Sequence, residues 1–246
     1  MENKATGVQS TLERLAKINP PRGEKVAKNY KEFKAKVGKN NLLILPTPMT
    51  GDPFLDWGSH KSLLDLPSKD TACNKHNHGQ ECLICDVIAD LQKQAWKANF
   101  PIWKPIEKKI RYYSYVIDLD NISEGLQLWS YGKSVLSQFE TWLKDLEGDE
   151  KEFYDQESPE KIIVTYDDKA DPMNMYKLNK KPLKAFDKKQ VAEWTSEIKP
   201  LNEIFKFDKT NEEIEVLLQT YTNKIQESLN STDVSEEENN LDSLKK

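Results

Sequence analysis

The stretch "KKIRYYSYVIDLD" (108–120) is rich in β-branched and aromatic residues. Such a composition is typical of a β-strand. A second run of the same kind, "GLQLWSYG" (125–132), follows after the short connection "NISE" (121–124). The two runs therefore predict a pair of neighbouring strands.

Further elements surround this pair on both sides. "NLLILPTP" (41–48) and "EKIIVTYDD" (160–168) are short apolar runs that suit buried strands. Helical periodicity marks "CLICDVIADLQKQAW" (82–96), "SVLSQFETWLKDLEG" (134–148) with a serine N-cap, and "TNEEIEVLLQTYTNKIQESL" (210–229). Because strands and helices do not alternate regularly, we expect a mixed α+β protein, mainly β, whose strands form a small barrel rather than a doubly wound sheet.

Composition and charge suggest one core with appendages. The chain has 246 residues, 37% of them hydrophobic, and a net charge of −5. It contains no run of about 18 apolar residues and no apolar leader, so we expect a soluble, intracellular protein without a membrane partner. We expect a basic arm (1–40), a core (41–229) and an acidic flexible tail (230–246).

The stretch "CNKHNHGQECLIC" (73–85) holds all three cysteines of the chain. Three cysteines cannot form a closed set of disulfides, whereas "CLIC" has the spacing that lets two thiolates bind one metal ion, with Cys73 as a third ligand. Zinc needs a fourth ligand, and local spacing favours His76 in "CNKH" without excluding His60. A structural zinc is expected rather than a catalytic one, because three thiolates usually close the ion to water.

The order of several motifs resembles the single-stranded DNA-binding proteins of T-even bacteriophages, the helix-destabilising replication proteins. These motifs are the basic arm, "NNLLILPTP", "HKSLL", "CLICDVI", "EKKIRYYSYVIDLDN", "GLQLWSYGKSV", "PMNMYKLNK" and the acidic tail. The resemblance implies a five-stranded OB-fold barrel with a zinc-binding subdomain at about 56–95. It also implies one zinc ion and favours His60 over His76 as the fourth ligand, so that the ligands are His60, Cys73, Cys82 and Cys85.

Binding of single strands requires cations for phosphates and aromatic faces on which bases stack. "WKPIEKKIRYYSY" (103–115) interleaves both kinds of residue, and one of its two adjacent tyrosines should point to each side of the strand. The alternative for each aromatic residue is packing in the core or sheet, and Tyr115 is expected to pack. From this stretch and from the resemblance, the expected DNA contacts are Trp96, Trp103, Lys108, Lys109, Arg111, Tyr112, Tyr113, Trp129 and Tyr176.

The resemblance implies a protein without catalytic activity that coats single-stranded DNA, largely independently of sequence, during replication, recombination and repair. It further implies cooperative assembly of the protein with itself through the arm, and contacts of the acidic tail with a polymerase, primase or helicase loader. The cytoplasm of an infected bacterium would be the location. Two alternatives stay open: a zinc-containing RNA-binding or transcription-associated module, and a zinc nuclease with an open coordination position.

Overall fold

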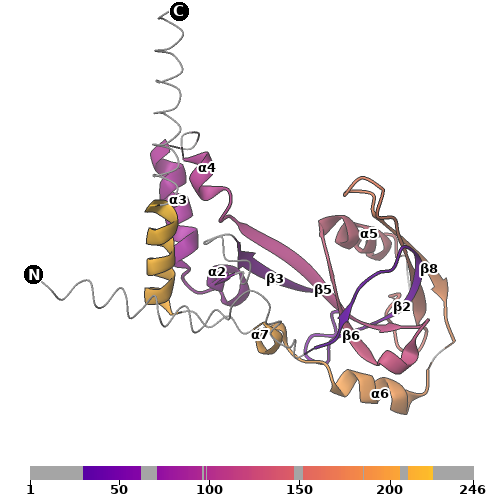
Figure 1. Cartoon of the computed structure of the whole chain (residues 1–246). Helices are drawn as coiled ribbons and strands as arrows, with labels where there is room; N and C mark the ends of the chain where they lie inside the picture. Colours follow the sequence, from indigo (N-terminus) through magenta and orange to yellow (C-terminus); the bar gives the residue numbers. More distant parts are fainter. Residues whose placement is uncertain are drawn as a thin grey trace, which may run out of the picture. The chain divides into compact units, whose positions relative to one another are not determined.

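The structure is a computed structural model that describes residues 30–61, 71–95, 97, 99–146, 152–184, 186–205 and 210–223. The chain divides into two compact units (Figure 1). The sheet unit contains the described residues of Ala27–Trp57 and Ile110–Lys206. The helical unit contains those of Gly58–Lys109 and of the segment from Phe207 onward.

The strands form one sheet whose main path is β1-β6-β5-β2-β7-β8. The bounds of these strands are β1 (Glu32–Phe33), β2 (Gly38–Leu45), β5 (Lys108–Asp118), β6 (Leu126–Tyr131), β7 (Glu160–Tyr166) and β8 (Tyr176–Pro182). The pairing of β1 with β6 is parallel and every other neighbouring pair on this path is antiparallel. Off the path, β3 (Leu55–His60) pairs with β5 and with β4 (Thr71–Ala72).

The four strands expected from the sequence are confirmed as β2, β5, β6 and β7, and the chain is mixed α and β. The structure does not show the expected barrel, because the sheet does not close among the described residues. The strands β1 and β8 lie at the two ends of the path and do not pair with each other. The short strand β1 takes the outer edge of β6 at Leu128 and Trp129. On this edge β6 is therefore paired at those two residues.

The boundaries expected for the arm and the subdomain also change. Residues 1–29 of the arm and the whole of the tail (230–246) lie outside the described residues. The last part of the expected arm is not an appendage, since β1 and the start of β2 belong to the sheet. The unit expected at 56–95 extends to Lys109 and gains a helix through 211–223.

An aromatic core fills the sheet unit. Helix α5 (Lys133–Lys144) buries Val135, Leu136 and Phe139. Phe139 follows Val135 by four residues and Leu136 by three, so all three lie on one side of the helix. The Phe139 ring stacks on that of Phe153 with 5.4 Å between centroids. The helix begins after Gly132 and not after the expected serine cap at 134.

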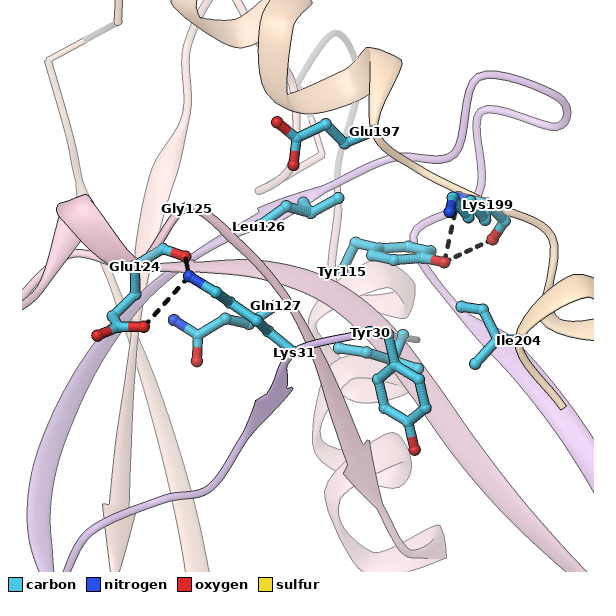
Figure 2. A pocket seen from close by; sticks show the side chains of 11 residues that line it. Tyr30, Lys31, Tyr115, Glu124, Gly125, Leu126, Gln127, Glu197, Lys199 and Ile204 are labelled. Carbon is cyan, nitrogen blue, oxygen red and sulfur yellow. Dashed lines mark hydrogen bonds and ion pairs between the residues drawn. The ribbon is translucent and has the colours of Figure 1, made fainter. Parts of the chain in front are cut away.

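The remaining elements of the sheet unit are η1 (Ile122–Glu124), α6 (Lys188–Ser196) and α7 (Leu201–Ile204). Between the start of β6 and the segment that joins α6 to α7 lies a cavity of about 700 Å³ (Figure 2). On one side of it the Tyr115 hydroxyl donates to the Lys199 carbonyl at 2.5 Å, and on another the Lys31 ammonium donates to the Glu124 carbonyl at 2.6 Å. Tyr115 is 4% exposed, which fits the packing role expected for it.

The helical unit is built from α2 (Asn74–His78), α3 (Leu83–Ala95), α4 (Phe100–Trp103) and the helix through 211–223. Its core contains Cys73, Cys82, Ile84, Ile88, Ile102, Trp103, Ile106, Ile214, Leu218 and Tyr221. The hydroxyl of Tyr221 donates to the Ile102 carbonyl at 2.9 Å, which fixes the last helix to α4. None of the helices in the described ranges combines the length and apolar character that crossing a membrane requires.

Candidate metal centre and tyrosine surface

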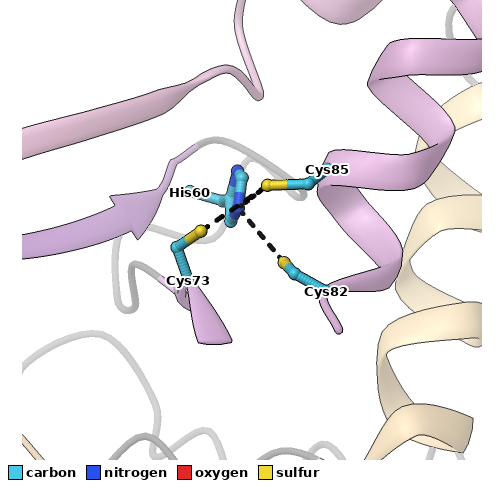
Figure 3. Close-up of side chains that lie close together, drawn as sticks. All are labelled: His60, Cys73, Cys82 and Cys85. Atoms are coloured by element: carbon cyan, nitrogen blue, oxygen red, sulfur yellow. Dashed lines mark hydrogen bonds between the residues drawn. The ribbon is translucent and has the colours of Figure 1, made fainter. Parts of the chain in front are cut away.

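The side chains of His60, Cys73, Cys82 and Cys85 converge in the helical unit (Figure 3). One ligand atom from each lies within 4.8 Å of the others, and all but Cys85 are buried. This group could hold a metal ion. The fold therefore brings together the three cysteines that were predicted from their spacing and the histidine that the resemblance favoured.

Local structure explains how residues so far apart in the sequence meet. His60 ends β3 and pairs in register with Thr71 of β4, so the strand pair places His60 beside Cys73. Cys73 is the N-cap of α2, and Cys85 lies in the first turn of α3. The centre thus joins a strand end, a helix cap and the beginning of a second helix.

A hydrogen bond to the backbone orients the His60 ring. Its Nδ1 lies 2.9 Å from the Ile106 carbonyl oxygen, which can only accept, so Nδ1 is the protonated nitrogen that donates. The other nitrogen, Nε2, then faces the thiols of Cys82 and Cys85 at 3.4 and 3.5 Å. A carbonyl that fixes the tautomer in this way is the usual support of a metal-binding histidine.

The spacing of the ligand atoms suits a tetrahedral zinc ion. Zinc–sulfur bonds of about 2.3 Å at tetrahedral angles place two sulfurs about 3.8 Å apart. The Sγ atoms of Cys73 and Cys85 are 3.5 Å apart. Only a small expansion of the cluster is needed to accommodate the ion.

The electrostatics of the cluster couple metal binding to the release of protons. Hydrogen bonds from Cys73 and then from Cys85 lower the pKa of the Cys82 thiol, whereas the pKa of Cys85 is raised through its contacts with Cys73 and Cys82. Burial alone would lower the pKa of His60, but its contacts with Cys73 and Cys82 outweigh burial and raise the pKa to about 9. The Cys82 thiolate is therefore favoured, while protons stay on Cys85 and His60, and a metal ion would have to displace these protons when it binds.

His76 and His78 do not belong to this group. The spacing in "CNKH" had favoured His76, but a ligand from the neighbouring strand replaces it. No local pattern marks His60, because strand pairing between β3 and β4 brings it to the centre. The resemblance supplied the signal that local spacing lacked.

Several tyrosines and cations gather in the sheet unit at the starts of α5 and β8. We call Arg111, Tyr112, Lys133, Tyr166 and Tyr176 the tyrosine surface. The Tyr166 and Tyr176 rings stack at 4.9 Å between centroids, and these residues face each other across β7 and β8. The ammonium of Lys133 lies 5.9 Å from the centre of the Tyr112 ring.

The tyrosine surface carries positive charge and neutral rings. Arg111 and Lys133 are exposed, and the three tyrosines are half-buried. Burial raises the pKa of Tyr176, and nearby Tyr166 acts in the same direction, while Arg111 lowers it. Because the net shift is upward, the Tyr176 hydroxyl stays neutral at neutral pH and adds no negative charge.

The other expected DNA contacts lie elsewhere. Trp103 and Trp129 are each 2% exposed and pack in the helical and sheet cores, so neither presents a face for stacking. Tyr113 contacts the Phe205 ring, whereas Tyr112 stacks on Tyr131, so the two adjacent tyrosines have different neighbours, as alternation along a strand predicts.

Three further expected contacts complete the set. Lys108 and Lys109 open β5 and belong to the helical unit. Trp96 lies outside the described residues. Lys133 and Tyr166 were not expected from the sequence. The only signals were that Lys133 stands at the start of a helix pattern and that Tyr166 stands at the end of a strand pattern.

Comparison with known proteins assigns this chain to no family. No protein-family model matches its sequence, and no curated protein matches it. The metal centre and the tyrosine surface are therefore the features from which a function is inferred.

Proposed function

We propose that this protein binds single-stranded DNA without strong sequence preference and that a structural zinc ion stabilises its helical unit. The observation that carries the DNA proposal is the stacked pair Tyr166 and Tyr176 close to the exposed Arg111. Aromatic rings bordered by cations are what unpaired bases and their phosphates require.

Each component of the tyrosine surface has a defined part in this proposal. Arg111 and Lys133 would neutralise phosphates, and a base would stack on the accessible side of the Tyr176 ring, adding about 1–3 kcal/mol. Lys133 also pairs with Glu140 at 2.9 Å, so DNA would have to compete with this carboxylate. We therefore assign Arg111 the larger electrostatic contribution.

The fold is compatible with an OB-fold, which the motif resemblance implies and which is part of this proposal. An OB-fold is a five-stranded, partly open barrel that binds oligonucleotides. The segment β6-β5-β2-β7-β8 supplies five strands in which every neighbouring pair is antiparallel. Helix α5 lies between β6 and β7 in the sequence.

The metal proposal rests on the chemistry of the ligands. Three thiols and one imidazole are typical ligands of structural zinc. Four protein ligands complete a tetrahedron, so no position stays open for water, and we propose a binding protein rather than an enzyme. The ion would hold the end of β3 and the start of α3 together.

The proposed biological setting is DNA replication, recombination and repair in a bacterium infected by a phage. Self-association through the basic arm and contacts of the acidic tail with a polymerase, primase or helicase loader are further proposals. They rest on the motif resemblance alone.

DNA binding is tested by titrating the protein with fluorescently labelled oligo(dT) at two salt concentrations. We expect binding at low salt and a steep loss at higher salt, because phosphate neutralisation releases counterions. Tyr176→Ala should weaken binding roughly 5- to 150-fold. Arg111→Gln should reduce the salt slope by about 0.7 for the contact it loses.

Lys93→Gln is the matched control for charge, because Lys93 is exposed and lies on α3 of the helical unit, outside the tyrosine surface. It should leave the affinity for oligo(dT) nearly unchanged. No complex at low salt would refute the DNA proposal, and tighter binding of an RNA homopolymer would favour the RNA-binding alternative.

The zinc proposal is tested by metal analysis of the purified protein. We expect about one zinc per chain, and His60→Ala should release it far more readily than His78→Ala. His78 is the control because it is exposed and lies outside the ligand group. Equal zinc retention by both variants would contradict the ligand assignment.

A further inference from the structure

A small arrangement of side chains next to the metal centre joins α2 to the strand that carries His60. The side-chain amide of Asn77 makes two hydrogen bonds with the backbone of Gly58. Its oxygen accepts from the Gly58 N–H at 2.8 Å, and its nitrogen donates to the Gly58 carbonyl at 3.0 Å. The same carbonyl also accepts from the Cys73 N–H at 2.9 Å.

These bonds continue the pairing of β3 with β4 beyond the end of β4. The last backbone pairs are His60 with Thr71 and Ser59 with Ala72, and the next partner of the strand would be Gly58. There the chain turns into α2, and the Asn77 amide supplies a donor and an acceptor as a peptide group would. Gly58 lies two residues before one ligand, and Asn77 lies four residues after another.

The third member of this arrangement is His76. A Cβ atom added at Gly58 would lie 2.7–2.9 Å from three carbon atoms of the His76 side chain, closer than side-chain carbons approach in real proteins. Gly58 does not need a left-handed backbone. The absence of a side chain at this position therefore serves the close packing of His76, not a special conformation.

We infer that Gly58, His76 and Asn77 act as a latch that positions His60 and Cys73 for the metal ion without touching it. This inference rests on the proposed metal centre. It assigns His76 a packing role in place of the ligand role that its spacing had favoured. Groups outside the ligand set that orient ligands typically change metal affinity by 10- to 100-fold when removed.

The latch is tested by measuring the affinity for Co²⁺ and Zn²⁺ in competition with a chelator, together with the visible spectrum of the Co²⁺ form. Asn77→Ala should bind both metals about 10- to 100-fold more weakly, with an unchanged tetrahedral Co²⁺ spectrum at saturation. Asn74→Ala is the matched control on the same helix, since its side chain makes no hydrogen bond to any described residue. It should bind like the wild type.

Two substitutions test the packing of His76 against Gly58 independently, and this test can be used even if Asn77→Ala is unstable. Gly58→Ala should weaken metal binding strongly, and adding His76→Ala should restore part of the affinity, because two of the three close carbon atoms are then removed. Equal affinities of Asn77→Ala and Asn74→Ala, or no rescue of Gly58→Ala, would overturn the latch. A wild-type protein that binds neither metal would instead refute the metal centre itself.

Discussion

The two units are stabilised by different kinds of core. The buried core of the sheet unit contains five aromatic residues that contact one another: Phe33, Trp129, Tyr131, Phe139 and Phe153. The core of the helical unit includes two cysteines of the metal centre among its buried residues and draws on α2, α3, α4 and the helix through 211–223. Apolar side chains fill the first core, whereas the second combines apolar side chains with two thiols of the metal centre.

The difference indicates where each unit obtains its stability. Large aromatic side chains bury much apolar area and interlock in preferred geometries. Small helices joined by loops bury less and commonly depend on a metal ion. We therefore expect the sheet unit to be stable by itself and the helical unit to depend on its ion.

Removal of the metal should produce the largest effect. A chelator should unfold the helical unit, because structural zinc typically contributes about 10–16 kcal/mol of apparent binding free energy to folding. Hydrogen exchange measured by mass spectrometry should show loss of protection in α3 and little change in β6 and β7. Equal protection of α3 with and without metal would contradict the proposed dependence.

Phe139→Ala should have the converse effect. Phe139 is fully buried and contacts several aromatic rings, so its truncation should lower the free energy of unfolding of the sheet unit by about 3–5 kcal/mol. Urea denaturation followed by tryptophan fluorescence measures this loss. Phe100→Ala serves as the control because Phe100 is 44% exposed, and zinc affinity should not change in either variant.

Alkaline pH should destabilise the sheet unit in particular. Burial raises the pKa of Tyr131, while a hydrogen bond with Ser114 lowers it less, so the neutral form is favoured in the folded state. This stabilisation is complete below about pH 10, the pKa of tyrosine in the unfolded chain. It falls as the pH rises above that pKa, by up to about 1.4 kcal/mol per pH unit.

Urea denaturation across pH 9–11 tests this expectation for Tyr131. The Tyr131→Phe variant should be less stable at neutral pH, because the buried Ser114 hydroxyl loses its partner at 2.7 Å. It should nevertheless show a shallower alkaline loss than the wild type. Equal slopes in both proteins would assign the alkaline transition to another group.

The surface ion pair of Lys104 and Glu107 should contribute least. Both side chains are about half exposed, so Lys104→Met should change the stability of the helical unit by less than about 1 kcal/mol. Thermal unfolding at low and high salt measures this difference. A loss comparable with that of Phe139→Ala would show that surface charge, and not the ion, governs the helical unit.

The elements that the sequence predicted best are those with a strong local pattern. The strands β5 and β6 are rich in aromatic and aliphatic residues, and α5 has apolar residues at helical spacing. The strand β8 was missed because lysines occupy much of it, as is common in strands at a sheet edge, and because the sequence reads as a basic segment. Its half-buried positions, Tyr176, Leu178 and Lys180, do alternate with exposed ones.

The candidate sites depended more on contacts that are distant in sequence. Three metal ligands follow from cysteine spacing, but His60 is brought in by strand pairing. Trp103 and Trp129 have the residue type of stacking platforms, yet the cores bury them. Residue type alone does not distinguish a packing role from a stacking role, because burial is decided by the tertiary fold.

The central position of β2 in the sheet has a consequence for the order in which the chain folds. The first and last ligands of the metal centre, His60 and Cys85, are only 25 positions apart in the sequence, so all four are available early during synthesis. In contrast, Asn40 of β2 pairs with Val164 of β7, 124 residues later. We expect nascent or truncated chains that end before β7 to expose one edge of an apolar strand, and an exposed strand edge favours aggregation.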